Sequence, residues 1–222
     1  MRRLPHAFYN LSPAGDPNRG LFFVTRELSA IANNLNHDAT RRRPKVIGVC
    51  EAINRALPEL DHYQLVRSTL NQSRANVALY VREDLELGET EWVRHEKTWP
   101  RAKDHDLTHE PRTTLVQDVE DWRIIVGHAP VGFGAEAARD EWLSILVDLL
   151  HIPGPVVALT DPNGLGDDLY RRVPSAVTGG TAIEAVHGRH VVIDSVHTPG
   201  VVNAVPMLSD HHRCLLGRLR RR

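Results

Sequence analysis

The sequence predicts an α/β protein built from two packed, mixed β-sheets that are flanked by helices. One observation behind this prediction is that short β-branched or aliphatic runs, with the length and composition of buried strands, recur along nearly the whole chain. The other is that some runs are joined by tight turns and others by segments with a helical repeat. No internal repeat or low-complexity linker divides the 222 residues, so we expect residues 1–222 to form a single domain.

The elements of the first half follow from apolar periodicity and from turn residues. A turn rich in Ser, Pro, Gly and Asp ends the first strand, and apolar residues then recur at three- and four-residue intervals, as on one face of a helix. Pro58 limits a short helix that begins after the second strand. The expected elements are a strand at 6–11, a helix at 21–36, a strand at 45–50, a short helix at 51–57 and strands at 62–67 and 75–82, the last two flanking a turn at 71–73.

The second half contains one segment without a clear period, 88–112, which is rich in charge, His and Trp. We expect it to be irregular, with a short strand near 91–97. Glu120 and Asp121 form a hairpin turn between two strands, and a later helix carries Trp142 and several Leu and Ile residues on one side. The expected elements are strands at 113–119 and 122–128, a helix at 134–151, a strand at 155–160, a weakly patterned stretch at 165–185 and strands at 190–197 and 211–217.

Composition and charge exclude some classes of protein. The formal net charge of −1 neither demands nor forbids a nucleic-acid partner, although Arg41–Lys45 and Arg218–Arg222 are basic clusters that suit phosphates or simply lie in solvent. Two cysteines, Cys50 and Cys214, form no disulfide framework and no zinc motif. The absence of a signal-like or membrane-spanning apolar stretch leads us to expect a cytoplasmic protein without a membrane partner. The sequence does not indicate an oligomeric state.

Short polar residues stand at the ends of the apolar runs, and this pattern carries the functional prediction. Polar ends of neighbouring buried strands converge on one cleft. Carboxylates suit a divalent cation there, and His and Asn suit an anion, so the combination points to metal-assisted chemistry on a phosphate. The residues are Asn10, Glu51, His128, Asp161, Asn163, Asp194, Asp210 and His211.

Taken together and in this order, these residues resemble the motifs of the endonuclease/exonuclease/phosphatase superfamily, which has the DNase I-like fold and includes the exonuclease III-like enzymes. The resemblance runs from Asn10 to His211 and so covers nearly the whole chain. It implies a four-layer α/β/β/α sandwich of two mixed β-sheets and a divalent-metal-dependent phosphodiester hydrolase. The implied cofactor is Mg²⁺ or Mn²⁺.

For the metal, the resemblance assigns Glu51, which closes the second core strand, with Asp210 as a second ligand and Asn10 nearby. Two of these residues also have simpler explanations from local structure. Glu51 suits the N-terminus of the helix expected after it, and Asn10 suits a cap on the turn that follows the first strand.

For the catalytic chemistry, the resemblance assigns His128 and Asn163 to the phosphoryl oxygens and Asp161 to the attacking water. The motif Gly-Asp-X-Asn of the family reads Thr160-Asp161-Pro162-Asn163 here. The alternatives are a hydrogen-bonded core histidine for His128 and an ordinary β-turn for Asp161 to Gly164.

The Ser-Asp-His motif at 209–211 gives His211 the role of general base, oriented by Asp194. A charged Asp194 inside an apolar strand is costly without such a partner. We expect Arg112 and Tyr80 on the substrate side, together with Arg82, which lies on the same strand as Tyr80. Arg112 could instead pair with Glu110.

We therefore expect a nuclease acting on DNA. Two alternatives stay open. The first alternative is an enzyme of the same fold that hydrolyses a small phosphorylated molecule or a lipid head group. The other is a non-catalytic member that binds nucleic acid or protein.

Overall fold

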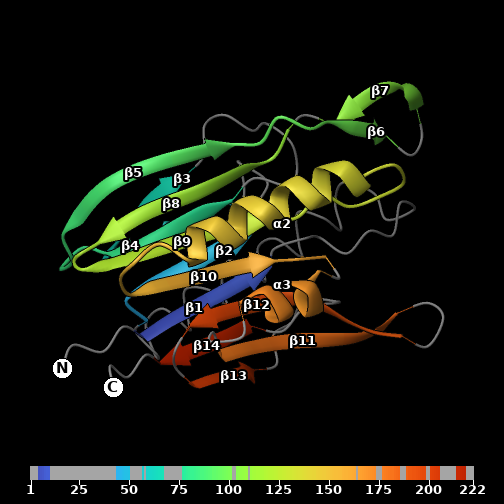
Figure 1. Ribbon diagram of the computed structural model, residues 1–222. Helices are drawn as coiled ribbons and strands as arrows, with labels where there is room; N and C mark the ends of the chain where they lie inside the picture. The colour runs from blue at the N-terminus through green and yellow to red at the C-terminus, as the bar shows by residue number, and fades with distance from the viewer. Residues whose placement is uncertain are drawn as a thin grey trace, which may run out of the picture.

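The computed structural model describes residues 5–10, 44–50, 57, 59–67, 77–101, 104–109, 111–163, 165–173, 177–185, 189–198, 201–205 and 214–218. Strands dominate this part of the chain, and two helices accompany them (Figure 1). The elements are β1 (Pro5–Asn10), β2 (Val46–Cys50), β3 (Tyr63–Arg67), β4 (Ala78–Arg82), β5 (Leu87–Arg94), β6 (Trp99–Arg101), β7 (Asp104–His109), β8 (Thr113–Val119), β9 (Trp122–His128), α2 (Glu136–Leu150), β10 (Val156–Asp161), α3 (Gly166–Arg172), β11 (Val177–Ala185), β12 (Arg189–Thr198), β13 (Val201–Val205) and β14 (Cys214–Arg218).

The strands form two six-stranded sheets and a separate two-stranded sheet. One large sheet has the order β13-β14-β1-β2-β4-β3, and the other has the order β11-β12-β10-β9-β8-β5. Each large sheet is mixed, because β1 pairs with β2 in parallel and β9 pairs with β10 in parallel, while the other pairs are antiparallel. The predicted fold class, two mixed sheets with helices, is confirmed.

The main core lies between the two large sheets. Val46 and Leu79 of one sheet pack with Leu115, Val126 and Leu159 of the other in a single buried cluster. The central strands β9 and β10 are buried on both faces, which explains why their sequences are almost continuously apolar.

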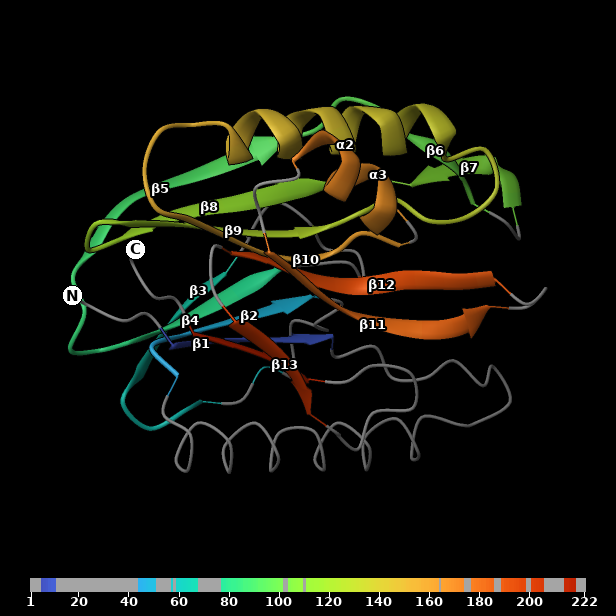
Figure 2. The ribbon, with the colours of Figure 1, turned by 60° about the horizontal axis from the view of Figure 1, so that its bottom comes forward.

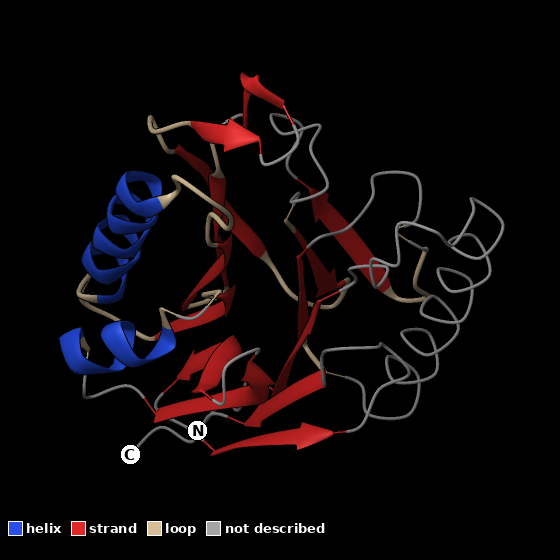
Figure 3. Ribbon diagram, turned by 90° about the vertical axis from the view of Figure 1, so that its right-hand side faces the viewer, coloured by secondary structure: helices blue, strands red, loops and turns tan. Residues whose placement is uncertain are grey.

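A second core lies on the outer face of the β8–β9–β10 sheet. Helices α2 and α3 cover that face, as Figures 2 and 3 show. Trp142 and Leu146 of α2 and Leu169 of α3 pack there with Ile125 and Ala158. Helix 134–151 was predicted, and its buried face is Ala138, Trp142, Leu143 and Leu146. The helices expected at 21–36 and 51–57, the first of which would form the other outer layer, lie outside the described residues, apart from position 57.

The prediction of an irregular segment at 88–112 was wrong, apart from the short strand expected near 91–97, which overlaps β5. The segment holds β5, β6 and β7, and only short connections separate them. Strand β5 is the edge of its sheet, and most of its side chains are exposed, so its sequence lacks the apolar alternation that reveals a half-buried strand. The weakly patterned stretch 165–185 likewise contains α3 and β11, and β13 lies between the strands expected at 190–197 and 211–217, where no strand was predicted.

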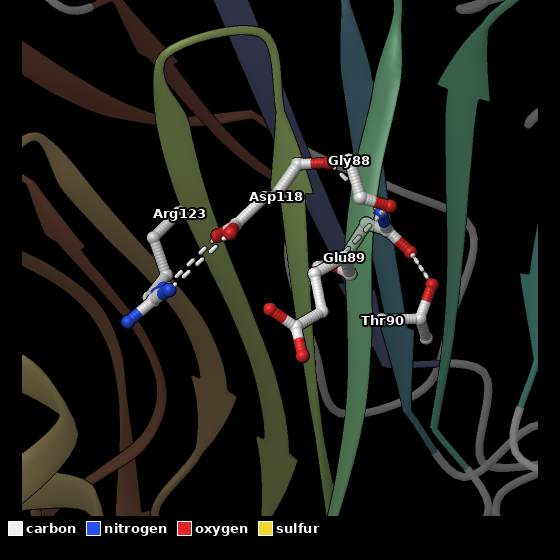
Figure 4. Close-up of polar contacts among 6 residues, drawn as sticks. Gly88, Glu89, Thr90, Asp118 and Arg123 are labelled. Atoms are coloured by element: carbon white, nitrogen blue, oxygen red, sulfur yellow. Dashed lines mark hydrogen bonds and ion pairs between the residues drawn. The ribbon is translucent and has the colours of Figure 1, made fainter.

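A buried glutamine fixes an irregularity in this edge strand. The register of β5 against β8 shifts between Leu87 and Thr90, which leaves an extra residue on β5. The Nε2 of Gln117 donates to the carbonyl oxygens of Gly88 (3.2 Å) and Glu89 (3.3 Å), and its Oε1 accepts from the hydroxyl of Thr90 (2.5 Å) (Figure 4). Gln117 therefore provides hydrogen-bond partners for backbone carbonyls of the bulge that the regular pairing of β5 with β8 does not provide.

Among the described residues, no helix combines the length and apolar character needed to cross a bilayer.

Candidate active site

The site begins at the ends of the two parallel strands β9 and β10. Their register places His128 directly opposite Asp161, and each is the last residue of its strand. Both residues are buried, with 2% and 1% of their surfaces exposed. The Nε2 of His128 lies 3.4 Å from Oδ2 of Asp161. Parallel pairing thus brings together two polar groups at the carboxyl edge of the sheet.

Asn163 completes this arrangement from the loop after β10. Its backbone N–H donates to Oδ1 of Asp161 (3.0 Å), and its φ is 45°, in the left-handed region that Asn tolerates better than most residues. The turn directs the side-chain amide back at the strand ends. Nδ2 lies 3.1 Å from Nε2 of His128 and donates to the carbonyl oxygen of Ala129 (3.0 Å). A turn closed by the Asp161 side chain and the converging polar groups are therefore both present in one loop.

Arg139, on the first half of α2, holds the same loop from outside. Its guanidinium donates to the backbone carbonyl oxygen of Asn163 (3.0 Å), while Asp161 holds the N–H of that residue. Both polar atoms of the Asn163 backbone therefore have partners. The sequence analysis missed Arg139, because nothing in its helical context indicates a link to a loop 24 residues later.

The arrangement suits proton transfer at His128. Its Nε2 faces an amide N–H donor on Asn163 and a carboxylate acceptor on Asp161. A ring nitrogen without a proton can accept from the amide, and a ring nitrogen with a proton can interact with the carboxylate. The histidine can therefore bind or release a proton while keeping a polar neighbour, as an acid–base group requires.

The second parallel pair points to the same edge of the molecule. Asn10, the last residue of β1, is opposite Cys50, the last residue of β2. Strands β1 and β10 point the same way in Figure 1, and the two sheets pack on each other through one core. Glu51 follows Cys50 directly in the sequence but lies outside the described residues. The side chain of Asn10 is also outside the description.

Strand β12 adds a third position beside β10. Thr160 is paired with Ser195, so Asp194 is the next residue of β12 toward Asp161 along this antiparallel ladder. The backbone register thus places Asp194 at the edge where β9 and β10 end, although its side chain is not described. Asp210 and His211 lie outside the described residues, a few positions before β14 begins at Cys214.

Arg112 lies beside this edge and is largely buried. It immediately precedes β8, the antiparallel neighbour of β9, and only 6% of its surface is exposed. Its guanidinium lies 5.1 Å from the centre of the Trp99 ring, within cation–π range. The structure therefore places Arg112 close to the His128 strand end, where it packs on an aromatic ring.

Tyr80 is not brought to the cluster. It lies in the middle of β4, opposite Ile47 of β2, and 1% of its surface is exposed. Its chain neighbours Leu79 and Val81 belong to the core between the sheets, so alternation along the strand directs Tyr80 to the other face. Arg82, at the end of this strand, pairs with Asp84.

A second buried histidine, His95, has a structural environment. Its Nε2 lies 2.9 Å from the hydroxyl of Thr114, and burial lowers the pKa of its imidazole to about 4; Arg112 also lowers this pKa, whereas Glu141 opposes the shift. The Glu141 carboxylate of α2 accepts the backbone N–H groups of Glu96 (3.0 Å) and Lys97 (2.9 Å). His95 and Glu141 thus attach the segment after β5 to the rest of the domain.

Within the described part of the chain, no group of three or more His, Cys, Asp or Glu side chains is arranged to hold a metal ion. Two of the three residues predicted near a metal, Glu51 and Asp210, are outside that part. Of the three, Asn10 is the residue whose backbone position is described. Asn10 and the residue before Glu51 end neighbouring strands, and amide and carboxylate oxygens are ligands that Mg²⁺ accepts.

Comparisons with known proteins establish the fold. No family model and no curated protein match the sequence. Among solved structures, an endonuclease/exonuclease/phosphatase from Bacteroides vulgatus is 15% identical with a TM-score of 0.71, and the match covers 99% of each chain. TDP2 from D. rerio, complexed with a single-strand DNA product, is 12% identical with a TM-score of 0.68, over 99% of this chain and 100% of that one. The human Nocturnin catalytic domain with bound sulfate is 13% identical with a TM-score of 0.65, over 98% and 94%.

These likenesses span whole chains, and they show the fold. This chain has the same fold as these proteins, which is the fold that the resemblance to the endonuclease/exonuclease/phosphatase superfamily predicted. The resemblance predicted from the strand-end residues is confirmed at that level.

Proposed function

We propose that the chain is a divalent-metal-dependent phosphodiester hydrolase, that its substrate is DNA, and that residues 1–222 form one catalytic domain. One observation carries the proposal: the direct juxtaposition of His128, Asp161 and Asn163 at the carboxyl edge of a DNase I-like sheet. Burial of a histidine and an aspartate at a strand end is unfavourable unless the polar groups have partners or a task, and here they point at one another.

In this proposal, His128 and Asn163 contact the phosphoryl oxygens, and Asp161 holds the turn and orients the attacking water. The amide of Asn163 is preorganised, since its backbone is held at both ends by Asp161 and Arg139. Preorganised donors that face developing charge reduce the reorganisation needed during reaction. Arg139 acts as a positioning residue, because it contacts only the backbone carbonyl of Asn163 in the described geometry.

Glu51, Asp210 and Asn10 would hold the cation, either Mg²⁺ or Mn²⁺. When bound, such an ion neutralises charge on the phosphate and its transition state. Asp194 would orient His211, the proposed general base. The register of β12, which brings Asp194 toward Asp161, supports a place for it at this edge. Arg112 is retained as a residue on the substrate side, and Tyr80 is given no substrate role because it lies in the middle of β4, opposite Ile47, and not at a strand end.

A nucleic-acid substrate is supported by the structural neighbour TDP2, which was solved with a single-strand DNA product. Phosphodiester hydrolysis needs the same phosphate contacts whether the substrate is DNA or a small molecule. Substrate class is therefore the first thing to test.

The test is cleavage of labelled single-stranded, duplex and abasic-site DNA in Mg²⁺ and in Mn²⁺, with EDTA as a control. Glu51→Ala and His128→Ala should each reduce turnover by roughly 100-fold or more. The matched control is Glu83→Ala, which removes an exposed carboxylate at a turn, and it should cleave like the wild type. Unchanged cleavage by Glu51→Ala would refute the metal assignment. Hydrolysis of a small phosphodiester with no cleavage of any DNA would refute the nuclease proposal. The broader proposal of a phosphodiester hydrolase would still hold.

A further inference from the structure

The loop that leaves the candidate site displays an exposed aromatic ring. Phe133 is 76% exposed and Val131 is 47% exposed, and they are the exposed large apolar side chains among the residues that the structure describes. Both belong to the loop of residues 129–135 that joins β9 to α2. Exposure of a phenylalanine is unfavourable in water, so a ring presented in this way is a candidate contact surface.

The loop is fixed on both sides of the ring. The indole Nε1 of Trp99 donates to the carbonyl oxygen of Val131 (2.9 Å). After the ring, a Cβ at Gly134 would lie 3.1 Å from Cδ of Pro100, so the backbone approaches β6 closely there. Trp99 itself is buried with Ala135 and Ala138. These contacts hold the loop ends against β6 and α2, and the ring is displayed between them.

Two glycines give the loop the shape that turns the ring outward. Gly132 and Gly134 flank Phe133 directly and have φ values of +112° and +73°, which L-residues rarely adopt. The backbone on both sides of Phe133 is therefore specified by sequence. The contacts of Val131 with Trp99 and of Gly134 with Pro100 restrain the loop on either side of the ring, and a preformed loop loses less entropy on binding.

The ring is close to the proposed phosphate site along the chain. Ala129 follows His128 directly; its N–H donates to the carbonyl of Asp161 (2.8 Å), and its carbonyl accepts from Asn163 (3.0 Å). The loop thus begins inside the hydrogen-bond network of the site. Phe133 comes five positions after His128 in the chain, which limits the distance between their Cα atoms to roughly 18 Å. A nucleotide close to the bound phosphate lies within this range.

We propose that Phe133 is a stacking platform for an unpaired nucleobase of the strand whose phosphate occupies the His128–Asn163 site. This inference rests on the proposed function and extends it to a specificity-determining residue. Every base has an apolar face that stacks on an aromatic ring, and stacking requires no cation.

The surroundings favour a base over a lipid surface. Glu136 and Asp140, both exposed, follow on the first turns of α2, and Arg139 is already engaged with the Asn163 carbonyl. Membrane-binding segments combine a broad apolar face with basic residues that meet anionic lipids. A single ring without a broad apolar face or a basic cluster lacks that combination, and its area matches one flat base.

The experiment measures binding of a single-stranded DNA oligonucleotide with phosphorothioate linkages, which slow cleavage, in Mg²⁺. A second oligonucleotide of equal length carries abasic spacers in place of nucleotides. The proteins are wild type, Phe133→Ala, Phe133→Tyr and Val131→Ala. Because Phe133 and Val131 are exposed, the melting temperatures of the variants should match the wild type. Val131→Ala is the matched control, since it removes exposed apolar area from the same loop but no aromatic face.

We expect Phe133→Ala to bind the base-bearing oligonucleotide roughly 5- to 100-fold more weakly, and Phe133→Tyr and Val131→Ala to bind it like the wild type. All four proteins should bind the abasic oligonucleotide equally. Equal binding of both oligonucleotides by Phe133→Ala and wild type would overturn the inference. A loss of affinity in Val131→Ala equal to that in Phe133→Ala would also overturn it, as would the absence of oligonucleotide binding by the wild type. Sedimentation with phosphatidylserine vesicles that depends on Phe133, in place of DNA binding, would overturn it as well.

The two proposals can fail separately. If the wild type cleaves DNA and Phe133→Ala binds and cleaves it equally well, the stacking inference is wrong and the nuclease proposal still holds. If base-dependent binding requires Phe133 but no DNA is cleaved, the stacking inference is correct for a protein that binds nucleic acid. The proposal that the protein hydrolyses DNA is then wrong.

Discussion

Replacement of Asn163 separates what this residue does for the fold from what it does for the reaction. Its backbone N–H and carbonyl are held by Asp161 and Arg139, and Ala or Gly at this position has the same two backbone groups for these contacts. Its side chain makes contacts to Ala129 and His128 that Ala and Gly both remove. Only the φ of 45° distinguishes the two replacements, because Gly adopts it freely and Ala does not.

The magnitudes follow from these contacts. Loss of the two side-chain contacts costs about 1 kcal/mol each. The left-handed backbone adds about 1 kcal/mol for Ala but nothing for Gly. We therefore expect Asn163→Ala to lower the free energy of unfolding by about 3 kcal/mol and Asn163→Gly by about 2 kcal/mol. Both should lower turnover by roughly 100-fold or more, because both remove the same donor from the phosphoryl oxygens.

The assays are urea denaturation at equilibrium and cleavage of a DNA oligonucleotide under conditions in which each variant is folded. A Gly variant that cleaves at the wild-type rate would show that the Asn163 side chain does not contact the reacting group. An Ala variant as stable as the Gly variant would show that the left-handed backbone is not retained in solution.

Three further predictions concern stability and can be checked by urea denaturation. Gly134→Ala should destabilise by about 1–3 kcal/mol, since its φ is +73° and the new Cβ would lie 3.1 Å from Cδ of Pro100, and a near-neutral result would contradict this. Gln117→Leu should destabilise by about 2–4 kcal/mol, because it leaves the bulge carbonyls of β5 unpaired, and a near-neutral result would refute that role. Burial lowers the folded-state pKa of His95 from 6.5 to about 4, so the unfolded state binds more protons between these values and stability should fall as the pH falls from about 6.5 toward 4. His95→Gln should show a smaller slope over this window, and an unchanged slope would assign the pH dependence to other groups.

Much of the fold was readable from the sequence because the central strands are buried on both faces. Strands β9 and β10 appear as nearly continuous apolar runs, whereas β8 mixes apolar residues with Thr, Gln and Asp. The predicted bounds of all three strands agree with the structure to within one residue. Strand β5 was only partly predicted, since an edge strand with exposed side chains needs no apolar period. Its bulge depends on Gln117, a residue 27–29 positions away in the sequence, and local patterns cannot indicate that contact.

For the site, the sequence by itself determined which chemical groups stand at strand ends: His128, Asp161 and Asn163 were identified from their positions after apolar runs. Only the tertiary structure decided which of them meet. His128 and Asn163 are 35 residues apart, and it is the parallel pairing of β9 with β10 that sets Asp161 opposite His128. The contact of Arg139 with the Asn163 loop and the burial of Tyr80 were also decided there. The physical reason is that periodicity records which face of an element is buried, whereas the partner across that face is set by sheet order and register, which depend on the packing of the whole chain.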